Sequence, residues 1–101
     1  MTRQQVTTVE TDVPIDSTGE KIRRAVPGDT LLKLNIEATE AAGYALDISA
    51  DGETWFTDEG SYGPSATVSD QFRVAAAYLR VRVNTAASAN QTADIAIQEA
   101  R

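Results

Sequence analysis

The chain has 101 residues and a formal net charge of −6, and it contains neither cysteine nor histidine. This length fits one domain or one subunit of an assembly. The composition excludes disulfides, thiolate or imidazole metal sites and histidine-based acid–base catalysis. It also disfavours nucleic acid or an anionic membrane as a partner, because both attract a surplus of Lys and Arg.

The first part of the chain differs from the rest. Residues 1–12 are polar and rich in threonine, with Val6 and Val9 as the only apolar anchors. We predict a polar N-terminal arm or an edge strand here, followed by a single domain over residues 13–101. No apolar run reaches the roughly 18–20 residues that span a bilayer, and the first ten residues lack the apolar core of a secretory signal. We therefore expect a soluble chain made in the cytoplasm.

Alternating apolar and polar residues predict short strands along most of the chain. They are expected at residues 21–26, 30–39, 44–49, 53–58, 66–74, 78–85 and 92–100. Glycine and proline predict loops at 37–43 and 58–64. About seven or eight short strands at close spacing favour an all-β antiparallel β-sandwich of jelly-roll or immunoglobulin-like type.

The clearest local signal is a hairpin. Tyr44, Leu46 and Ile48 alternate with smaller or polar residues before Asp51-Gly52, a pair that suits a tight turn. Trp55 and Phe56 follow it, and neighbours on a strand point to opposite faces. We therefore expect one of these two aromatic residues in the core and the other at an interface.

Further interface candidates lie later in the chain. Tyr62 sits in a glycine-rich segment, and Tyr78, Arg80 and Arg82 share the outward face of the strand predicted at 78–85. The planar guanidinium groups suit carboxylate partners. Those partners are either acidic residues of a neighbouring molecule or acidic residues across the same sheet.

Catalytic and metal-binding interpretations find little support in the sequence. Four acids near the hairpin fit solvated turns better than a glycosidase pair or a calcium loop: Asp51, Glu53, Asp58 and Glu59. In the absence of histidine, only Lys21 or Lys33 could activate a nucleophile, and both occupy ordinary strand positions. We predict no enzyme activity, no metal site and no cofactor.

The balance of charged residues suggests an environment. Only two of the nine basic residues are lysines, and acidic residues, alanine and threonine are abundant. Such a composition is expected of a protein in high salt, which screens the self-repulsion of an acidic surface. An ordinary acidic domain is the alternative.

Two segments carry a resemblance: LDISADGETW at 46–55 and YLRVRV at 78–83. The pattern S-x-D-G-x-x-W followed by Y-[LV]-R-[VL] resembles that of small β-sandwich structural proteins of tailed viruses, over about residues 30–100. Together with the acidic composition, this resemblance suggests a virus of a salt-loving archaeal host. Related sandwiches serve as capsid decoration proteins, turret or fibre subunits, and tail components.

The resemblance implies a non-enzymatic virion structural protein, expected to be a capsid decoration (cementing) protein. Its partner would be the major capsid protein or another virion protein, and it would act as a homo-oligomer, with a trimer favoured. One alternative is a turret or tail module that binds a host-surface glycan or receptor through Trp55, Tyr62 and Tyr44. Another is a small cellular sandwich domain without a viral connection.

Overall fold

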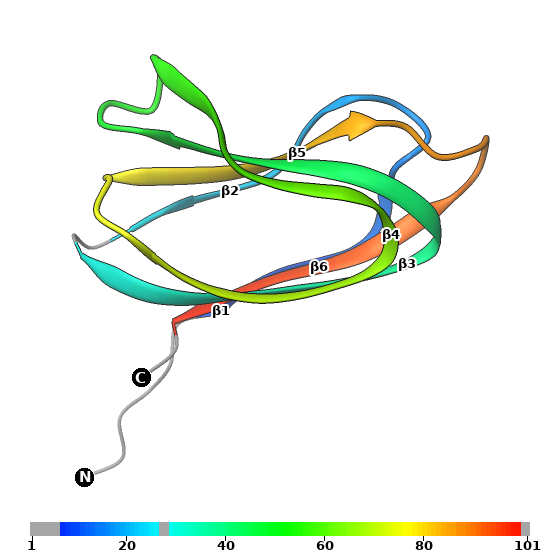
Figure 1. Ribbon diagram of the computed structural model, residues 1–101, viewed down its shortest axis with the longest axis horizontal. Coiled ribbons are helices and arrows are strands. Elements are labelled where there is room, and N and C mark those ends of the chain that lie inside the picture. The colour runs from blue at the N-terminus through cyan, green and yellow to red at the C-terminus, as the bar shows by residue number, and fades with distance from the viewer. Residues whose placement is uncertain (1–6, 27–28, 100–101) are drawn as a thin grey trace, which may run out of the picture.

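The computed structural model describes residues 7–26 and 29–99 (Figure 1). Within these residues it contains six strands: β1 (Thr7–Pro14), β2 (Gly19–Ala25), β3 (Thr30–Ser49), β4 (Trp55–Val74), β5 (Tyr78–Thr85) and β6 (Thr92–Glu99). All paired strands are antiparallel. The prediction of an all-β antiparallel fold is therefore confirmed.

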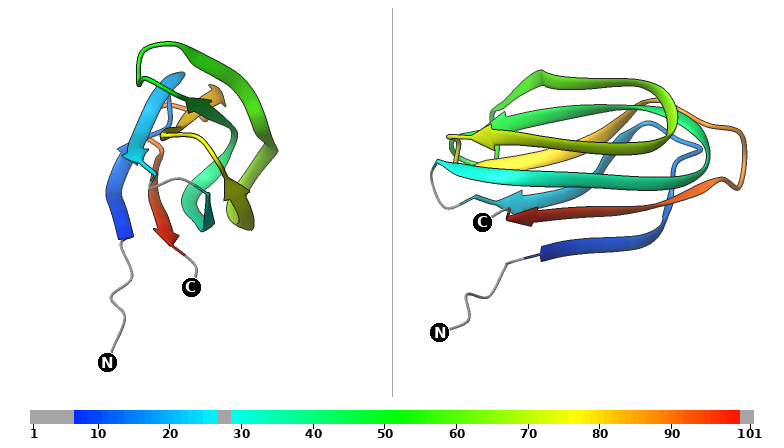
Figure 2. Two further views of the ribbon diagram at one scale, coloured as in Figure 1. Left: turned by 90° about the vertical axis from the view of Figure 1, so that its left-hand side faces the viewer. Right: turned by 60° about the horizontal axis from the view of Figure 1, so that its bottom comes forward.

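The six strands form one sheet, which curls into an open half-barrel (Figure 2). The curled sheet is not clearly divided into the two stacked sheets of a sandwich. The strand order is β1-β6-β3-β5-β2, and β4 pairs with β3 along both of its halves. The first half of β3 pairs with β6, and its second half pairs with β5. We call β1 and β6, with the first half of β3 and the second half of β4, the β6 wall. We call β2 and β5, with the second half of β3 and the first half of β4, the β5 wall.

Both predicted loops at 37–43 and 58–64 belong to strands, so the predicted strand number was wrong. β3 and β4 are each 20 residues long and continue through these segments. The register shifts between Glu37 and Ala42 show where the paired strands bend from one wall to the other. A Cβ atom on Gly43 would lie only 2.6 Å from the Asn84 side chain, so glycine permits the close approach of β5 at this bend.

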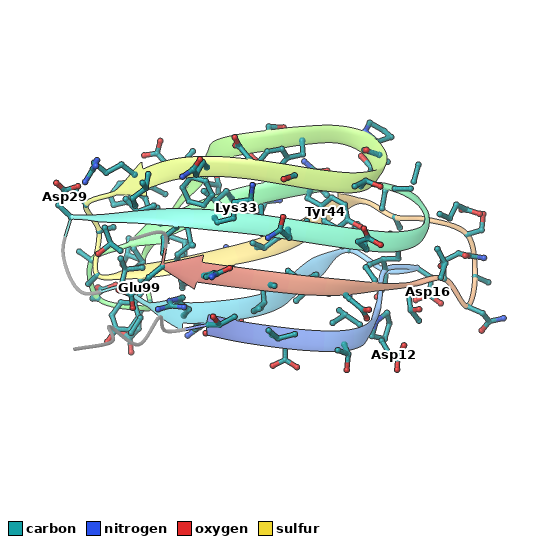
Figure 3. All side chains as sticks on the ribbon, turned by 90° about the horizontal axis from the view of Figure 1, so that it is seen from below. Asp12, Asp16, Asp29, Lys33, Tyr44 and Glu99 are labelled. Atoms are coloured by element: carbon teal, nitrogen blue, oxygen red, sulfur yellow. The ribbon has the colours of Figure 1, made fainter. Side chains whose placement is uncertain are left out.

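The core lies between the two walls. Its fully buried side chains come from alternate positions of the central strands: Leu32, Leu34, Ile36, Tyr44, Leu79, Val81, Val83, Ile95 and Ile97. The apolar residues of the segments predicted as strands at 30–39, 78–85 and 92–100 therefore point into the core. Tyr44 fills the middle part of the molecule and is its largest fully buried side chain (Figure 3).

The part of the chain predicted as an arm is partly strand. β1 runs from Thr7 to Pro14 along β6, with Thr7 opposite Gln98, and it forms one edge of the sheet. Residues 1–6, the first half of the predicted arm, lie outside the described residues. Among residues 7–26 and 29–99, no helix is long and apolar enough to cross a membrane.

A buried ion pair joins the walls on the side of β1 and β2. Arg24 of β2 places Nη2 3.0 Å from Glu99 Oε2 of β6, and both side chains are at most 5% exposed. Arg24 Nη1 also donates to the Ile97 carbonyl oxygen at 3.1 Å and to Thr8 Oγ1 at 3.4 Å. One arginine thus links β2 to β6 and β1, where no backbone pairing connects the two walls.

Candidate functional site

The turn between β3 and β4 is built from its own polar side chains. Ser49 Oγ accepts the Gly52 N–H at 2.8 Å, and Asp51 Oδ1 accepts the N–H groups of Thr54 and Glu53, each at 2.8 Å. The two backbone hydrogen bonds from Thr54 and Glu53, with a third from the Ser49 hydroxyl, lower the pKa of Asp51 below its ordinary value. Gly52 has a φ of 81°, a conformation in which glycine carries no steric cost.

This turn folds over the outward face of the β5 wall. A Cβ atom on Gly52 would lie 3.5 Å from the Tyr78 ring, so the turn contacts this ring closely. Arg23 Nη1 of β2 donates to the Gly52 carbonyl oxygen at 3.4 Å. The turn that begins β4 therefore covers part of β5 and contacts β2.

Trp55 lies on this same outward face, close to two cations. The guanidinium carbon of Arg80 is 4.4 Å from its ring centroid and that of Arg23 is 5.1 Å away. Both distances fall within the range of cation–π attraction. Phe56, the next residue, is 60% exposed. The prediction that one of the two aromatic residues fills the core is wrong, because the core position belongs to Tyr44.

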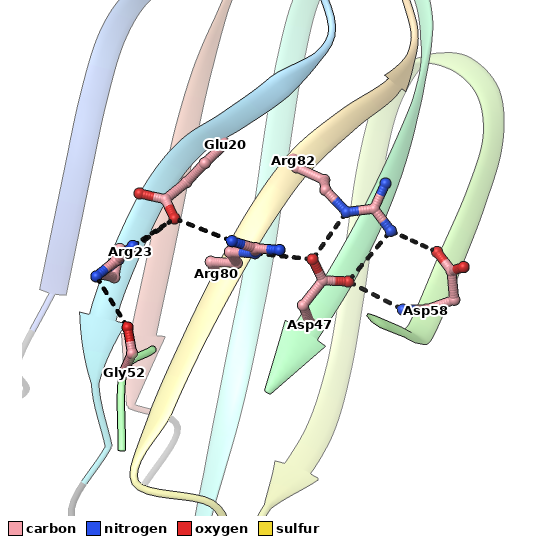
Figure 4. A network of polar contacts seen from close by, with 7 residues as sticks. All are labelled: Glu20, Arg23, Asp47, Gly52, Asp58, Arg80 and Arg82. Atoms are coloured by element: carbon pink, nitrogen blue, oxygen red, sulfur yellow. Dashed lines mark hydrogen bonds and ion pairs between the residues drawn. The ribbon is translucent and has the colours of Figure 1, made fainter. Parts of the chain in front are cut away.

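Asp47 of β3 is the centre of a charged network on the β5 wall, and none of its surface is exposed (Figure 4). Its Oδ2 accepts from Arg80 Nε and from Arg82 Nε, each at 2.8 Å. Its Oδ1 accepts the Asp58 N–H at 2.9 Å and Arg82 Nη2 at 3.4 Å. Every group around this carboxylate is a donor.

The network continues to both sides of Asp47. Arg82 Nη2 lies 2.8 Å from Asp58 Oδ1, and Arg80 Nη1 lies 3.6 Å from Glu20 Oε1. Glu20 Oε1 also lies 2.9 Å from Arg23 Nη2. Three guanidinium groups and three carboxylates thus alternate from β2 across β5 and β3 to β4 (Figure 4). Of the two predicted roles for Arg80 and Arg82, the structure shows pairing within the chain.

The network shifts the protonation equilibria of its members. Burial by itself raises the pKa of Asp47, but the hydrogen bonds from Arg82, Arg80 and the Asp58 backbone outweigh it, and the pKa lies below its ordinary value. The hydrogen bond that Arg82 donates to Asp47 likewise raises the pKa of Arg82. Asp47 and Arg82 therefore both stay charged at neutral pH.

The sequence interpretation placed Asp47 on the polar face of its strand and missed its central role. A bulge explains its burial: Leu46 pairs with Gly60 and Ile48 pairs with Phe56, so three residues of β4 lie opposite Asp47 alone. Asp58, in the middle of this bulge, has a φ of 62° and donates its N–H to Asp47. The sequence did contain a signal for this ion pairing, because Asp47 occupies an outward position on one strand and the two arginines occupy outward positions on another.

A cavity opens between the two halves of β4, and we call it the mouth. It has a volume of 280 Å³, and its apolar lining includes Leu46, Ile48, Tyr62, Phe72 and Val74. Tyr62 O–H donates to Asp70 Oδ2 at 2.7 Å and so links the two halves of β4. Burial, with the hydrogen bond and charge of Asp70, raises the pKa of Tyr62, so the phenol keeps its proton. Tyr62 therefore lies partly buried on a strand, not on a loop.

The remaining candidates are the acids near the hairpin and the lysines. In residues 7–26 and 29–99, no group of three or more acidic side chains is placed to hold a metal ion. Of the four acids near the hairpin, Asp51 stabilises its own turn and Asp58 pairs with Arg82. Lys21 Nζ donates to Ser17 Oγ at 3.2 Å.

Comparisons with known proteins give no family or relative. No protein-family model matches the chain, and neither a curated protein nor a solved structure matches it.

Proposed function

We propose that this protein is a non-enzymatic structural protein of a virus particle, a capsid decoration protein that binds the shell as a homo-oligomer. The observation that carries the proposal is β4. This strand of 20 residues pairs with β3 on one side only, among the residues that the structure describes. An unpaired strand edge of this length is a template for pairing with another chain.

The surroundings of β4 support a protein partner. Phe56 is 60% exposed on this strand, and the apolar mouth opens between its two halves. Exposed aromatic and apolar groups beside an unpaired edge are typical of protein–protein interfaces. Six charged groups on the outward face of the β5 wall, in contrast, pair with one another within the chain.

The finer fold in this proposal is a small jelly-roll-type sandwich. Its support is the course of β3 and β4, which both pass from one wall to the other around a common core. In the decoration role, such subunits occupy symmetric positions and bridge neighbouring capsid proteins, adding buried interface area where the shell is under pressure. The resemblance to small sandwich proteins of tailed viruses supports the same role.

The glycan-binding alternative fits less well. It requires Trp55, Tyr62 and Tyr44 to share a contact surface. Tyr44 is fully buried, Trp55 is stacked against Arg80, and the Tyr62 hydroxyl is bound to Asp70.

A particle-stability experiment tests the proposal. Particles stripped of the protein are expected to rupture at lower temperature and lower salt, and added wild-type protein should restore their resistance. Phe56→Glu should restore it poorly, because a charge replaces the exposed aromatic ring beside β4. Ala89→Glu, in the exposed loop between β5 and β6, is the matched control. Stripped particles as resistant as intact ones would refute the decoration role.

A further inference from the structure

The β5 wall has two free edges of opposite charge. In the described part of the chain, β2 has backbone pairing only with β5, although its Arg24 side chain also contacts β1, and β4 has backbone pairing only with β3. The β2 edge carries Lys21 and Arg23 with one acid, Glu20, which pairs with Arg23. The β4 edge carries Glu59 and Asp58, of which Asp58 pairs with Arg82. The wall is therefore basic along one edge and acidic along the other.

These charges lie at matching positions along their strands. Arg23 is opposite Arg80, Arg80 is opposite Asp47, and the bulge of β4 opposite Asp47 contains Asp58 and Glu59. A line drawn across the strands through Asp47 thus ends in cations at β2 and in carboxylates at β4. A second copy placed beside the first, without a shift along the strands, would bring these opposite charges together.

The strand directions also fit such a neighbour. Each of the steps from β2 to β5, from β5 to β3 and from β3 to β4 is antiparallel. β2 and β4 therefore run in opposite directions. A neighbouring copy rotated about an axis parallel to the strands keeps their direction. Its β2 would run antiparallel to the free edge of β4, and the sheet would continue from one molecule to the next.

The β4 edge carries two features that limit such pairing, the bulge opposite Asp47 and Pro64, but it lacks a third. Its sequence contains no lysine, and its only basic residue is Arg73 near its end. Exposed edges are usually protected by lysines, among other features. Phe56 and the mouth lie beside this edge and would be covered by the neighbour.

We infer that this protein assembles head to tail, with the β4 edge of one copy seated on the β2 edge of the next. The inference rests on the homo-oligomer of the proposed function and names its interface. A two-fold pairing of β4 with β4 would instead bring the acidic bulges of both copies to the same interface. A head-to-tail contact gives a closed ring of three copies, the favoured trimer, if each copy is rotated by a third of a turn from the last, and an open filament if the rotation does not close.

Charge exchange provides the first test. Lys21→Glu and Glu59→Lys should each weaken self-association by about fivefold at low ionic strength, measured by analytical ultracentrifugation. The double variant should restore it, because the pair is then reversed. Lys33→Glu, a change of the same charge on the β6 wall, is the control and should have a smaller effect. Equal effects of Lys21→Glu and Lys33→Glu, without rescue in the double variant, would overturn the inference.

Engineered cysteines provide the second test, because the chain has none of its own. Glu20 and Ser61 lie on one line across the β5 wall, through Arg82 and Ala45. Three strand spacings separate their Cα atoms by about 14 Å, too far for a disulfide within one chain. Glu20→Cys combined with Ser61→Cys should therefore form covalent dimers and trimers on mild oxidation. Ser61→Cys with Ala89→Cys is the control and should not.

The outcomes separate this inference from the proposed function. A monomeric mass in solution, with no cross-linking of the Glu20→Cys and Ser61→Cys pair, would overturn the head-to-tail interface. If that monomer still restored the heat resistance of stripped particles, the decoration role would stand. An oligomer that is not cross-linked at this pair would also overturn the interface if its self-association is unchanged by Lys21→Glu and by Glu59→Lys.

Discussion

Replacement of Asp47 by Asn tests whether the buried carboxylate holds the β5 wall together. All four contacts of the carboxylate come from donors: Arg80 Nε, Arg82 Nε, Arg82 Nη2 and the Asp58 N–H. An asparagine of the same shape would turn one oxygen into an NH₂ group that faces these donors. It would also leave two guanidinium groups without their shared counter-charge.

The size of the effect follows from the exposure of the partners. Removing one member of a buried ion pair costs roughly 3–5 kcal/mol. The Arg80 and Arg82 side chains are 19% and 22% exposed, and they keep Glu20 and Asp58 as further partners. We therefore expect Asp47→Asn to lower the free energy of unfolding by about 2–3 kcal/mol. For a domain of this size, that loss lowers Tm by about 8–24 °C.

Urea and thermal unfolding, followed by the fluorescence of Trp55, measure this loss. Trp55 is the only tryptophan and is stacked on Arg80, so it reports on the network itself. Asp58→Asn is the matched control, because its carboxylate is 62% exposed and its loss should cost at most about 1 kcal/mol. Equal destabilisation by the two substitutions would refute the assignment of Asp47 as the centre of the network.

Three further predictions concern the same fold. The Tyr44 hydroxyl is buried without a hydrogen-bond partner, so Tyr44→Phe should leave stability unchanged or raise it by about 1 kcal/mol in urea unfolding; a clear loss would contradict this. Gly43→Ala should cost about 1–3 kcal/mol in the same assay, because its Cβ would contact Asn84; unchanged stability would show that the β3 bend tolerates a side chain. The folded-state pKa values of Asp47 and Asp51 are lowered, so their stabilisation is present above the ordinary aspartate pKa of about 3.9 and is lost as the pH falls through the folded values. Tm should therefore fall below about pH 4, and an unchanged Tm down to pH 2 would contradict this sign.

The bends in β3 and β4 show why local sequence signals predicted too many strands. Glycine and proline at 43 and 63–64 interrupt the alternating pattern, and such interruptions predict loops. The same residues also permit a long strand to bend sharply and keep its partner. Only the pairing of β3 with both β6 and β5 distinguishes a bend from a chain reversal.

The aromatic residues after the turn show a second limit. Alternation placed Trp55 and Phe56 on opposite faces but gave no information on what each face contacts. Arg23 and Arg80 come from strands that are distant in sequence, and their approach to Trp55 depends on how the turn folds over β5. The burial of Asp47 likewise depends on a bulge in the facing strand.

The sequence by itself determined the all-β class, the turn at Asp51-Gly52 and the inward faces of the central strands, because these follow from local period and turn chemistry. The tertiary structure alone decided the curl of the sheet and the number of strands. It also decided the burial of Asp47 and the free edges at β2 and β4, which require knowing which strands lie side by side. Those edges, and not a reactive group, are where we expect this protein to meet its partners.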